Sequence, residues 1–276
     1  MFYLWLTLFG CMSGVTAVLF GFGGGFVVLP LLYRMLMARY GVDDPIGQAA
    51  MHIAVATSTC VMIVNALIAT GKHHRAGHLI RHYLWPLGGF IGVGAALGAV
   101  AAMHASGQLI RLAFIAYLGL TILDCLFRDG FLTHSQLRNP RRLSRSEQSG
   151  GGVGVGVIAT FLGVGGSVMT VPLLRRCGLS MSQATSMANP LSLPVALAGT
   201  LTYMAMAGFS AFDLGPWFVG YVDLLAFAVL TVGSVVGIRL ATPWIGRIPD
   251  RVHSRIYVGL LVLVLMSMCA KQGWNQ

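Results

Sequence analysis

Long apolar runs alternate with short polar stretches along the whole chain, and this alternation predicts a helical protein that crosses a membrane several times. Apolar runs of about 20 residues are long enough to span the hydrocarbon core as helices. Glycine, proline and clusters of charged residues separate the runs, as expected of loops. We therefore expect an all-α, polytopic membrane protein with apolar helical segments at 3–20, 24–38, 47–70, 83–103, 109–127, 150–162, 166–176, 183–207, 217–240 and 255–270.

A short motif occurs twice and divides the chain into two similar parts. The first copy, at 21–32, reads GFGGGFVVLPLL, and the second, 142 residues later at 163–174, reads GVGGSVMTVPLL. In each copy, glycines interrupt an apolar run and a proline-bearing apolar run follows. Irregular backbone at membrane depth must be buried in protein or line a cavity, and a pair of such interruptions indicates a transporter binding site. We predict a first membrane repeat at 1–127, a cytoplasmic linker at 128–149 and a second membrane repeat at 150–276.

The distribution of basic residues favours two repeats of opposite orientation. Suppose that each repeat is a re-entrant pair of half-helices followed by three transmembrane helices. The loops on one side of the membrane then carry 14 of the 18 Lys and Arg residues, which makes that side cytoplasmic. Three crossings per repeat is an odd number, so the repeats are predicted to be inverted. If each glycine break is instead part of a full crossing, the charge bias remains acceptable, and this alternative stays open. Because the net charge of +10 is explained by loops, no nucleic-acid partner is predicted.

The glycine breaks are the candidate substrate site. The N-terminus of a helix presents unpaired N–H groups and a partial positive charge, which suits an anion. Hydroxyl and amide groups on the next span of each half can donate hydrogen bonds to an oxyanion. The predicted substrate-binding residues are Gly23, Gly24, Gly25, Phe26, Thr57, Ser58, Asn65, Gly165, Gly166, Ser167, Thr185, Ser186 and Asn189.

Two simpler explanations compete with that interpretation. The glycines can serve only to let helices pack closely, and each hydroxyl can bond back to the preceding turn of its own helix. Small residues spaced four apart, at Gly94 and Gly98 and again at Gly233 and Gly237, also favour close packing. Pro190 and Pro194 can break the helical hydrogen bonds of their span, and we expect unwinding there.

The remaining polar groups predict neither catalysis nor a metal centre. Asp124 and Asp223 lie near span ends and are expected to be interfacial. His52 could respond to protons, but a hydrogen-bonded structural role is expected. In the stretch 72–82, His74, His78 and His82 recur every four residues and could share a helix face, but the surrounding Lys and Arg oppose a cation. No nucleophile triad, carboxylate pair or phosphate loop is present, so we predict no enzyme, no cofactor and no metal.

These features together resemble the TauE/SafE family of anion transporters, also called the sulfite exporter or TSUP family. The resemblance rests on the twin motifs 21–30 and 163–172, each followed by a Thr-Ser pair at 57–58 or 185–186, and on the small-residue spans. It implies transport of sulfite, organosulfonates, thiosulfate or related anions across the bacterial inner membrane. The chain departs from a regular repeat at Ser167, which replaces the third glycine, and in the longer separation of Pro30 from Ser58.

We therefore expect a multi-pass secondary transporter of the bacterial inner membrane that exports a small, sulfur-containing oxyanion such as sulfite or an organosulfonate. Its expected partners are the substrate and the lipid bilayer, and a homo-oligomer remains open. One alternative is a channel of the same fold for an anion or a neutral solute. Another is a membrane accessory protein or enzyme that uses the histidine-rich stretch 72–82. Saturation of flux and metal content distinguish the three.

Overall fold

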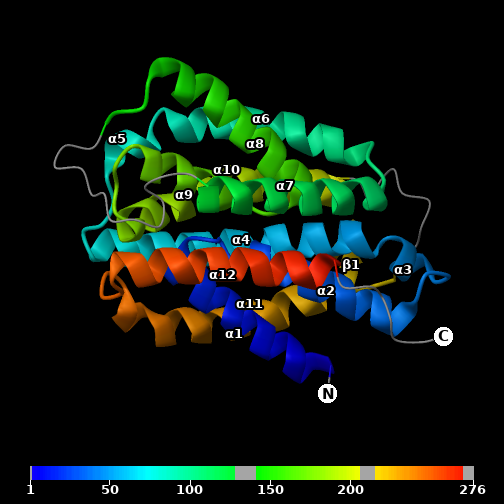
Figure 1. The fold of residues 1–276 in the computed structure, drawn as a ribbon. Coiled ribbons are helices and arrows are strands. Elements are labelled where there is room, and N and C mark those ends of the chain that lie inside the picture. Colours follow the sequence, from blue (N-terminus) through cyan, green and yellow to red (C-terminus); the bar gives the residue numbers. More distant parts are fainter. Residues whose placement is uncertain (1, 128–140, 206–214, 270–276) are drawn as a thin grey trace.

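The computed structural model describes residues 2–127, 141–205 and 215–269, and in these ranges the chain forms a bundle of helices with one two-residue-per-strand hairpin (Figure 1). In chain order the elements are α1 (Phe2–Phe20), α2 (Gly25–Tyr40), α3 (Pro45–Gln48), α4 (Ala50–Arg75), α5 (Arg81–Leu84), α6 (Leu87–Met103), α7 (Gly107–Phe127), the π-helix η1 (Glu147–Gly151), α8 (Gly152–Leu162), α9 (Ser167–Arg176), α10 (Met181–Ala205), β1 (Phe218–Val219), β2 (Val222–Asp223), α11 (Leu224–Ala241), the 3-10 helix η3 (Thr242–Trp244) and α12 (Asp250–Cys269).

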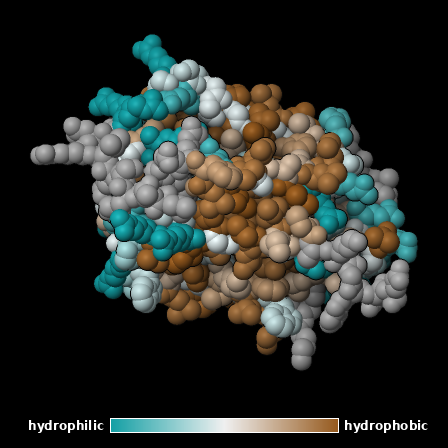
Figure 2. Space-filling view, viewed as in Figure 1, coloured by the Kyte–Doolittle hydropathy of each residue, from teal (hydrophilic) through white to brown (hydrophobic). Residues whose placement is uncertain are grey.

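The surface of the bundle suits a lipid bilayer. Within the described residues, six helical segments are long and apolar enough to cross a membrane: Tyr3–Phe20, Ala50–Arg75, His82–Met103, Gly107–Phe127, Leu224–Trp244 and Asp250–Cys269. Large apolar side chains such as Leu97 and Leu120 point outward and are 57% and 68% exposed. Figure 2 shows a wide hydrophobic band on the face in view, with hydrophilic residues toward both ends of the molecule. The predicted all-α, multi-pass membrane fold is confirmed.

The first helix of each half packs against a helix of the other half. Helix α1 runs parallel to α11 of the second half, with Gly10 against Leu230 and Gly14 against Ser234. A Cβ atom on Gly14 would overlap the carbonyl oxygen of Ser234, so the two backbones touch directly. Close approach of this kind needs small residues, which is the packing that membrane helices favour.

In the same way, the first helix of the second half packs against a helix of the first half. Helix α8 runs parallel to α6 of the first half, with Gly94 against Val153 and Gly98 against Val157. As the spacing of small residues predicts, these glycines allow close packing, but their partner belongs to the other half of the chain. Helices α4 and α10 form the centre and are antiparallel, since Thr59 lies beside Thr200 and His73 beside Ser186.

The two interrupted helix pairs lead toward opposite ends of the bundle. In Figure 1, α2 leads from the first break toward the end that holds α3, and α9 leads from the second break toward the end that holds α5. Both pairs turn back on themselves in this view. This arrangement agrees with the expected re-entrant pairs, while the opposite orientation of the repeats stays a prediction.

Three differences between the predicted and the observed helices have physical reasons. The span expected to end at residue 70 continues as α4 to Arg75, because His73 is buried and hydrogen-bonded inside the bundle. The span expected from residue 217 begins only at Leu224, because Asp223 caps α11 after the short hairpin. Helix α10 runs unbroken through Pro190 and Pro194, so the expected unwinding there is wrong. Residues 128–140 of the predicted linker, 206–207 of one span and residue 270 of another lie outside the described residues.

Candidate functional site

The two glycine breaks are buried and meet at the centre of the bundle. A Cβ atom on Gly23 or on Gly165 would lie within 3.0 Å of the side chain of Met62 in α4 and within 3.7 Å of Ser192 in α10. A Cβ atom on Gly25 would lie 3.6 Å from the carbonyl oxygen of residue 163. Gly23, Gly25 and Gly165 are therefore brought together, around Met62 and Ser192, two side chains that are not among the predicted binding residues.

Positive φ angles explain why the breaks need glycine. Gly23 and Gly24 have φ angles of 62° and 85°, and Gly163 and Gly165 have φ angles of 68° and 74°. Residues with a side chain rarely adopt this left-handed region. Gly166 differs, with a φ angle of −67°. A Cβ atom there would lie 3.5 Å from both the carbonyl oxygen of Leu191 in α10 and the side chain of Val155 in α8.

Each second half-helix presents unpaired N–H groups to the interior. In α2 the first helical hydrogen bond is donated by the N–H of Val28 to the carbonyl of Gly24, at 3.3 Å. In α9 the N–H of Thr170 bonds to the carbonyl of Gly166, at 2.9 Å. Within the described part of the chain, the N–H groups of Gly25, Phe26, Ser167 and Val168 have no hydrogen-bond partner. A buried helix end without partners suits a bound anion.

The opposite, electronegative end of α1 is covered by side-chain donors from three helices. Asn189 Nδ2 of α10 donates to the carbonyl of Ala17 at 3.1 Å. His73 Nε2 of α4 donates to the carbonyl of Val18 at 2.8 Å. His253 Nε2 of α12 donates to the carbonyl of Leu19, also at 2.8 Å.

The C-terminal end of α8 is covered by the backbone of the second break itself. The N–H groups of Gly163 and Val164 donate to the carbonyls of Thr160 and Ala159, at 3.2 and 3.1 Å. Three of the last four carbonyl groups of α1 and two of the last four of α8 are thus hydrogen-bonded, whereas the first N–H groups of α2 and α9 have no partner among the described residues. These open N–H groups are the feature of the site that suits an anion.

A polar network fixes the first break. Asn65 Nδ2 donates to Ser13 Oγ at 3.2 Å, and Ser13 Oγ donates to the carbonyl of Gly24 at 2.9 Å. Ser234 Oγ of α11 donates to Asn65 Oδ1. All three side chains are fully buried. The predicted binding residue Asn65 thus lies beside the break, with its amide hydrogen-bonded to protein groups.

Most of the other predicted hydroxyls donate to their own helices. Ser58 Oγ donates to the carbonyl of Val55 at 3.0 Å, and Thr185 Oγ1 donates to the carbonyl of Met181 at 3.0 Å. Ser186 Oγ donates to the carbonyl of Ser182 at 2.6 Å and lies 3.0 Å from His73 Nδ1. These arrangements match the alternative in which a hydroxyl bonds back to the preceding turn.

The predicted residues differ in their distance from the breaks. The backbone of Thr185 contacts Gly21, and the backbone of Ser58 lies 3.2 Å from the Cβ position of Gly25. Thr57 lies apart, because its hydroxyl accepts a hydrogen bond from the N–H of Asp223 at the start of α11. The ring of Phe26 stacks on Phe22, with centroids 4.6 Å apart, and leaves only its backbone N–H for a ligand.

The other ionisable groups have structural partners. His52 bonds to the carbonyl of Ala105 at 3.2 Å, and Asp124 pairs with Arg176 at 2.6 Å. Asp223 accepts hydrogen bonds from two N–H groups of the first turn of α11. These contacts confirm the expected hydrogen-bonded role of His52, whereas the interfacial position of Asp124 and Asp223 stays a prediction.

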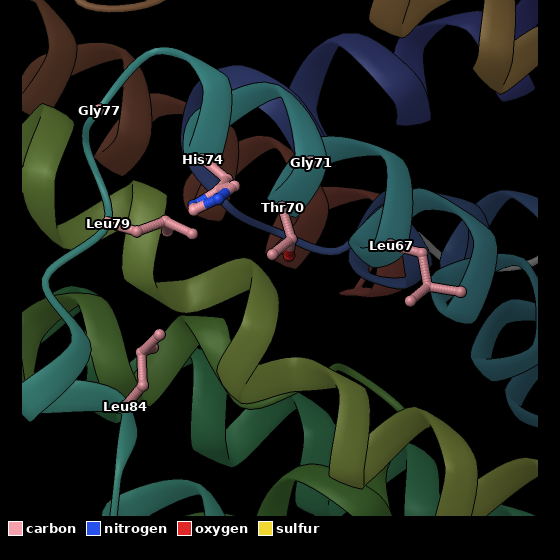
Figure 3. Close-up of a pocket in the computed structure, with 7 residues that line it drawn as sticks. All are labelled: Leu67, Thr70, Gly71, His74, Gly77, Leu79 and Leu84. Carbon is pink, nitrogen blue, oxygen red and sulfur yellow. The ribbon is translucent and has the colours of Figure 1, made fainter.

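The histidine-rich stretch does not form one helix face. Helix α4 ends at Arg75 and α5 begins at Arg81, so His74, His78 and His82 do not follow a continuous helix, and the expected common face is wrong. His74 and Thr70 line an open hollow of about 570 Å³, together with leucine and glycine residues. Figure 3 shows both side chains pointing toward the leucines across it. A search of the described residues finds no group of three His, Cys, Asp or Glu that could hold a metal.

Comparison with known proteins agrees with this architecture. The family described as sulfite exporter TauE/SafE matches residues 6–268. The chain belongs to the TauE/SafE family. This membership confirms the resemblance stated on the twin motifs, and the match covers both breaks and every helix that contacts them.

Curated relatives of this TauE/SafE chain match over nearly their full lengths. A probable membrane transporter protein of Haemophilus influenzae is 22% identical over 273 residues, which is 98% of this chain and 99% of the relative. A probable membrane transporter protein of Methanocaldococcus jannaschii is 22% identical, covering 94% of this chain and 92% of the relative. One of Xylella fastidiosa is 24% identical, covering 96% and 94%. No solved structure matches the chain. Family and relatives together indicate a multi-pass membrane transporter rather than an enzyme.

Proposed function

We propose that this TauE/SafE protein is a secondary transporter that exports a small sulfur-containing oxyanion, such as sulfite or an organosulfonate, across the bacterial inner membrane. The observation that carries the proposal is the pair of buried helix N-termini at the two breaks, whose N–H groups lack partners among the described residues. Oxygen atoms of a small anion accept hydrogen bonds from such groups, and the helix dipoles favour the negative charge.

Among the described residues, the side chains nearest the glycines of the breaks carry no positive charge, which favours transport over tight binding. The side chains that the structure places against Gly23, Gly25 and Gly165 belong to Met62 and Ser192, not to lysine or arginine. An anion held by N–H dipoles alone can leave again, as a transport cycle requires. The relatives are named only as probable membrane transporters, so the substrate and the direction of flux belong to the proposal.

The proposed cycle alternates access to the breaks from the two sides of the membrane. We infer inverted repeats, because α2 and α9 lead toward opposite ends of the bundle in Figure 1 and the basic loops favour that topology. Each break then belongs to a helix pair that enters from one side. Movement of these pairs against the central helices α4 and α10 would open one side at a time.

Sulfite flux in proteoliposomes tests the proposal. The informative variant is Gly166→Leu, because a Cβ atom at this position meets nothing closer than 3.5 Å while a longer side chain fills the space at the break. The matched control is Gly119→Leu on α7, where a Cβ atom meets nothing within 4 Å. We expect saturable sulfite flux in the wild-type protein and in the control, and a loss of about tenfold or more in Gly166→Leu, the effect of removing about 1.4 kcal/mol of binding.

Other outcomes would contradict the proposal in different ways. Flux that rises linearly with sulfite concentration would indicate the channel alternative. Equal rates in well-folded Gly166→Leu and Gly119→Leu proteins would remove the breaks from the transport path. No flux of sulfite, sulfonates or thiosulfate in the wild-type protein would refute the substrate class.

A further inference from the structure

Three hydroxyl groups around the second break are buried and unpaired. Ser167, Thr170 and Thr160 have no exposed surface, and within the described residues their hydroxyl oxygens have no hydrogen-bond partner. Buried polar groups in proteins are nearly always hydrogen-bonded, so each exception requires an explanation. Serine and threonine in a helix can also bond back to the preceding turn, as Ser58 and Thr185 do. The unpaired state of the three is therefore unusual.

The hydroxyls of Ser167 and Thr170 share one face of α9, and that face points into the protein. They are three residues apart, which places their side chains on the same side of a helix. The other side of α9, with Met169 and Pro172, lines an outward groove of about 290 Å³ together with α7. Ser167 is the first residue of α9, so its hydroxyl lies at the helix end whose N–H groups are open.

The third hydroxyl comes from the helix that precedes the break. Thr160 lies near the end of α8, and its methyl group approaches the Cβ position of Gly199 in α10 at 3.6 Å. Thus both helices that meet at the second break bring an unpaired hydroxyl into the interior, next to α10.

The first break lacks these hydroxyls and uses its polar groups differently. The positions 142 residues earlier than Thr160, Ser167 and Thr170 are residues 18, 25 and 28, which are valine, glycine and valine. At the first break, Ser13 contacts the Cβ position of Gly24, and its hydroxyl is hydrogen-bonded; at the second break, Val155 takes the corresponding place beside Gly166. Polar groups at the first break are therefore paired with each other, and those at the second break are not.

We propose that the second break carries the ligand-contacting side chains, with the hydroxyls of Ser167 and Thr170 and the N-terminus of α9 forming a subsite for the oxygen atoms of a small oxyanion. The first break contributes open N–H groups but no unpaired side chain to this subsite. A hydroxyl can donate to a sulfite or sulfonate oxygen and can also accept from a protonated one. This inference rests on the proposed function. It adds that the second half of the chain determines the choice of substrate.

Binding measurements on purified protein in detergent test the inference. The probes are sulfite, methanesulfonate and acetate, and the readout is the concentration dependence of the melting temperature, which gives an apparent Kd. The variants Ser167→Gly and Thr170→Val each install the residue found at the matching position of the first break. Thr170→Ser keeps the hydroxyl. Thr231→Val removes another buried, unpaired hydroxyl, on α11.

We expect Ser167→Gly and Thr170→Val to weaken sulfite binding by about tenfold each, because a hydrogen bond to a charged group is lost. Their melting temperatures without ligand should be unchanged or higher, since an unpaired buried hydroxyl has been removed. Thr170→Ser and Thr231→Val should bind as the wild-type protein does. If the wild-type protein binds and both loss variants bind equally well, this inference alone is overturned. If no anion stabilises the wild-type protein, the proposed function is overturned with it.

Discussion

Replacing Asn65 by valine would remove the centre of the network that holds the first break. Asn65 receives a hydrogen bond from Ser234 on α11 and donates one to Ser13 on α1, so its side chain joins three helices. Hydrogen bonds between membrane helices contribute about 0.6 kcal/mol each on average. Loss of the acceptor also leaves the Ser234 hydroxyl unpaired in the interior, which adds about 1 kcal/mol or more. We expect Asn65→Val to lower the free energy of unfolding by about 2 kcal/mol.

A double-mutant cycle separates the network from simple packing. Ser234→Ala removes the donor, so the double variant leaves no unpaired hydroxyl at this position and should lose less stability than the two single variants predict together. The expected coupling is about 0.5–1.7 kcal/mol. The measurement is unfolding by SDS in mixed micelles. Thr121→Val serves as the control, because the Thr121 hydroxyl donates only to its own helix, at Tyr117.

Strict additivity of Asn65→Val and Ser234→Ala would refute the network as the source of stability. The same variants also test the sequence-based placement of Asn65 in the substrate site. If sulfite affinity falls tenfold while stability changes little, the Asn65 amide contacts the anion in the working protein. If stability falls and affinity persists, its role is to hold the first break.

Three further predictions concern the rest of the bundle. Gly14→Leu should lower the melting temperature by about 5 °C or more, because any side chain there overlaps the backbone of α11, whereas Gly119→Leu should not; equal melting temperatures would contradict the close contact. Asp250→Asn should destabilise the protein by about 3–5 kcal/mol in the same SDS assay, since it breaks the buried pair with Arg175, whose side chain is 4% exposed; a change below about 1 kcal/mol would show that the pair is dispensable. A hydrogen bond from Arg141 lowers the pKa of Glu147 from 4.5 to about 2. The contribution of this ion pair to folding stability is therefore present above pH 4.5 and is lost as the pH falls toward 2. Glu147→Gln should therefore flatten the fall in melting temperature over that range, and an unchanged pH profile would contradict the pairing.

The sequence predicted the breaks well because their signals are local. The glycine clusters and the following proline-bearing runs place the second half-helices at 24–38 and 166–176, and the structure has them at Gly25–Tyr40 and Ser167–Arg176. Predicting these two helix starts requires only the conformational freedom of glycine and the energetic cost of unpaired backbone groups in lipid. Apolar length likewise predicted the helical membrane fold.

The sequence could not predict features that depend on tertiary contacts. The burial of His73 follows from its contact with the carbonyl of Val18, 55 residues earlier in the chain, and no local pattern indicates it. Pro190 is tolerated inside α10 because packing on both sides holds the helix together. The hydroxyl of Ser58 is hydrogen-bonded and that of Ser167 is not. This difference depends on the side-chain rotamer and the neighbouring groups, so the residue type alone cannot predict it.

The glycine contacts between α1 and α11, and between α6 and α8, have a mechanical consequence. Each contact joins one piece of the first repeat to one piece of the second through touching backbones. Bodies that move as units during a transport cycle must therefore be assembled from both repeats, because separating the repeats would split two tightly fitted seams. The two repeats predicted from the sequence would then not coincide with the parts that move during transport.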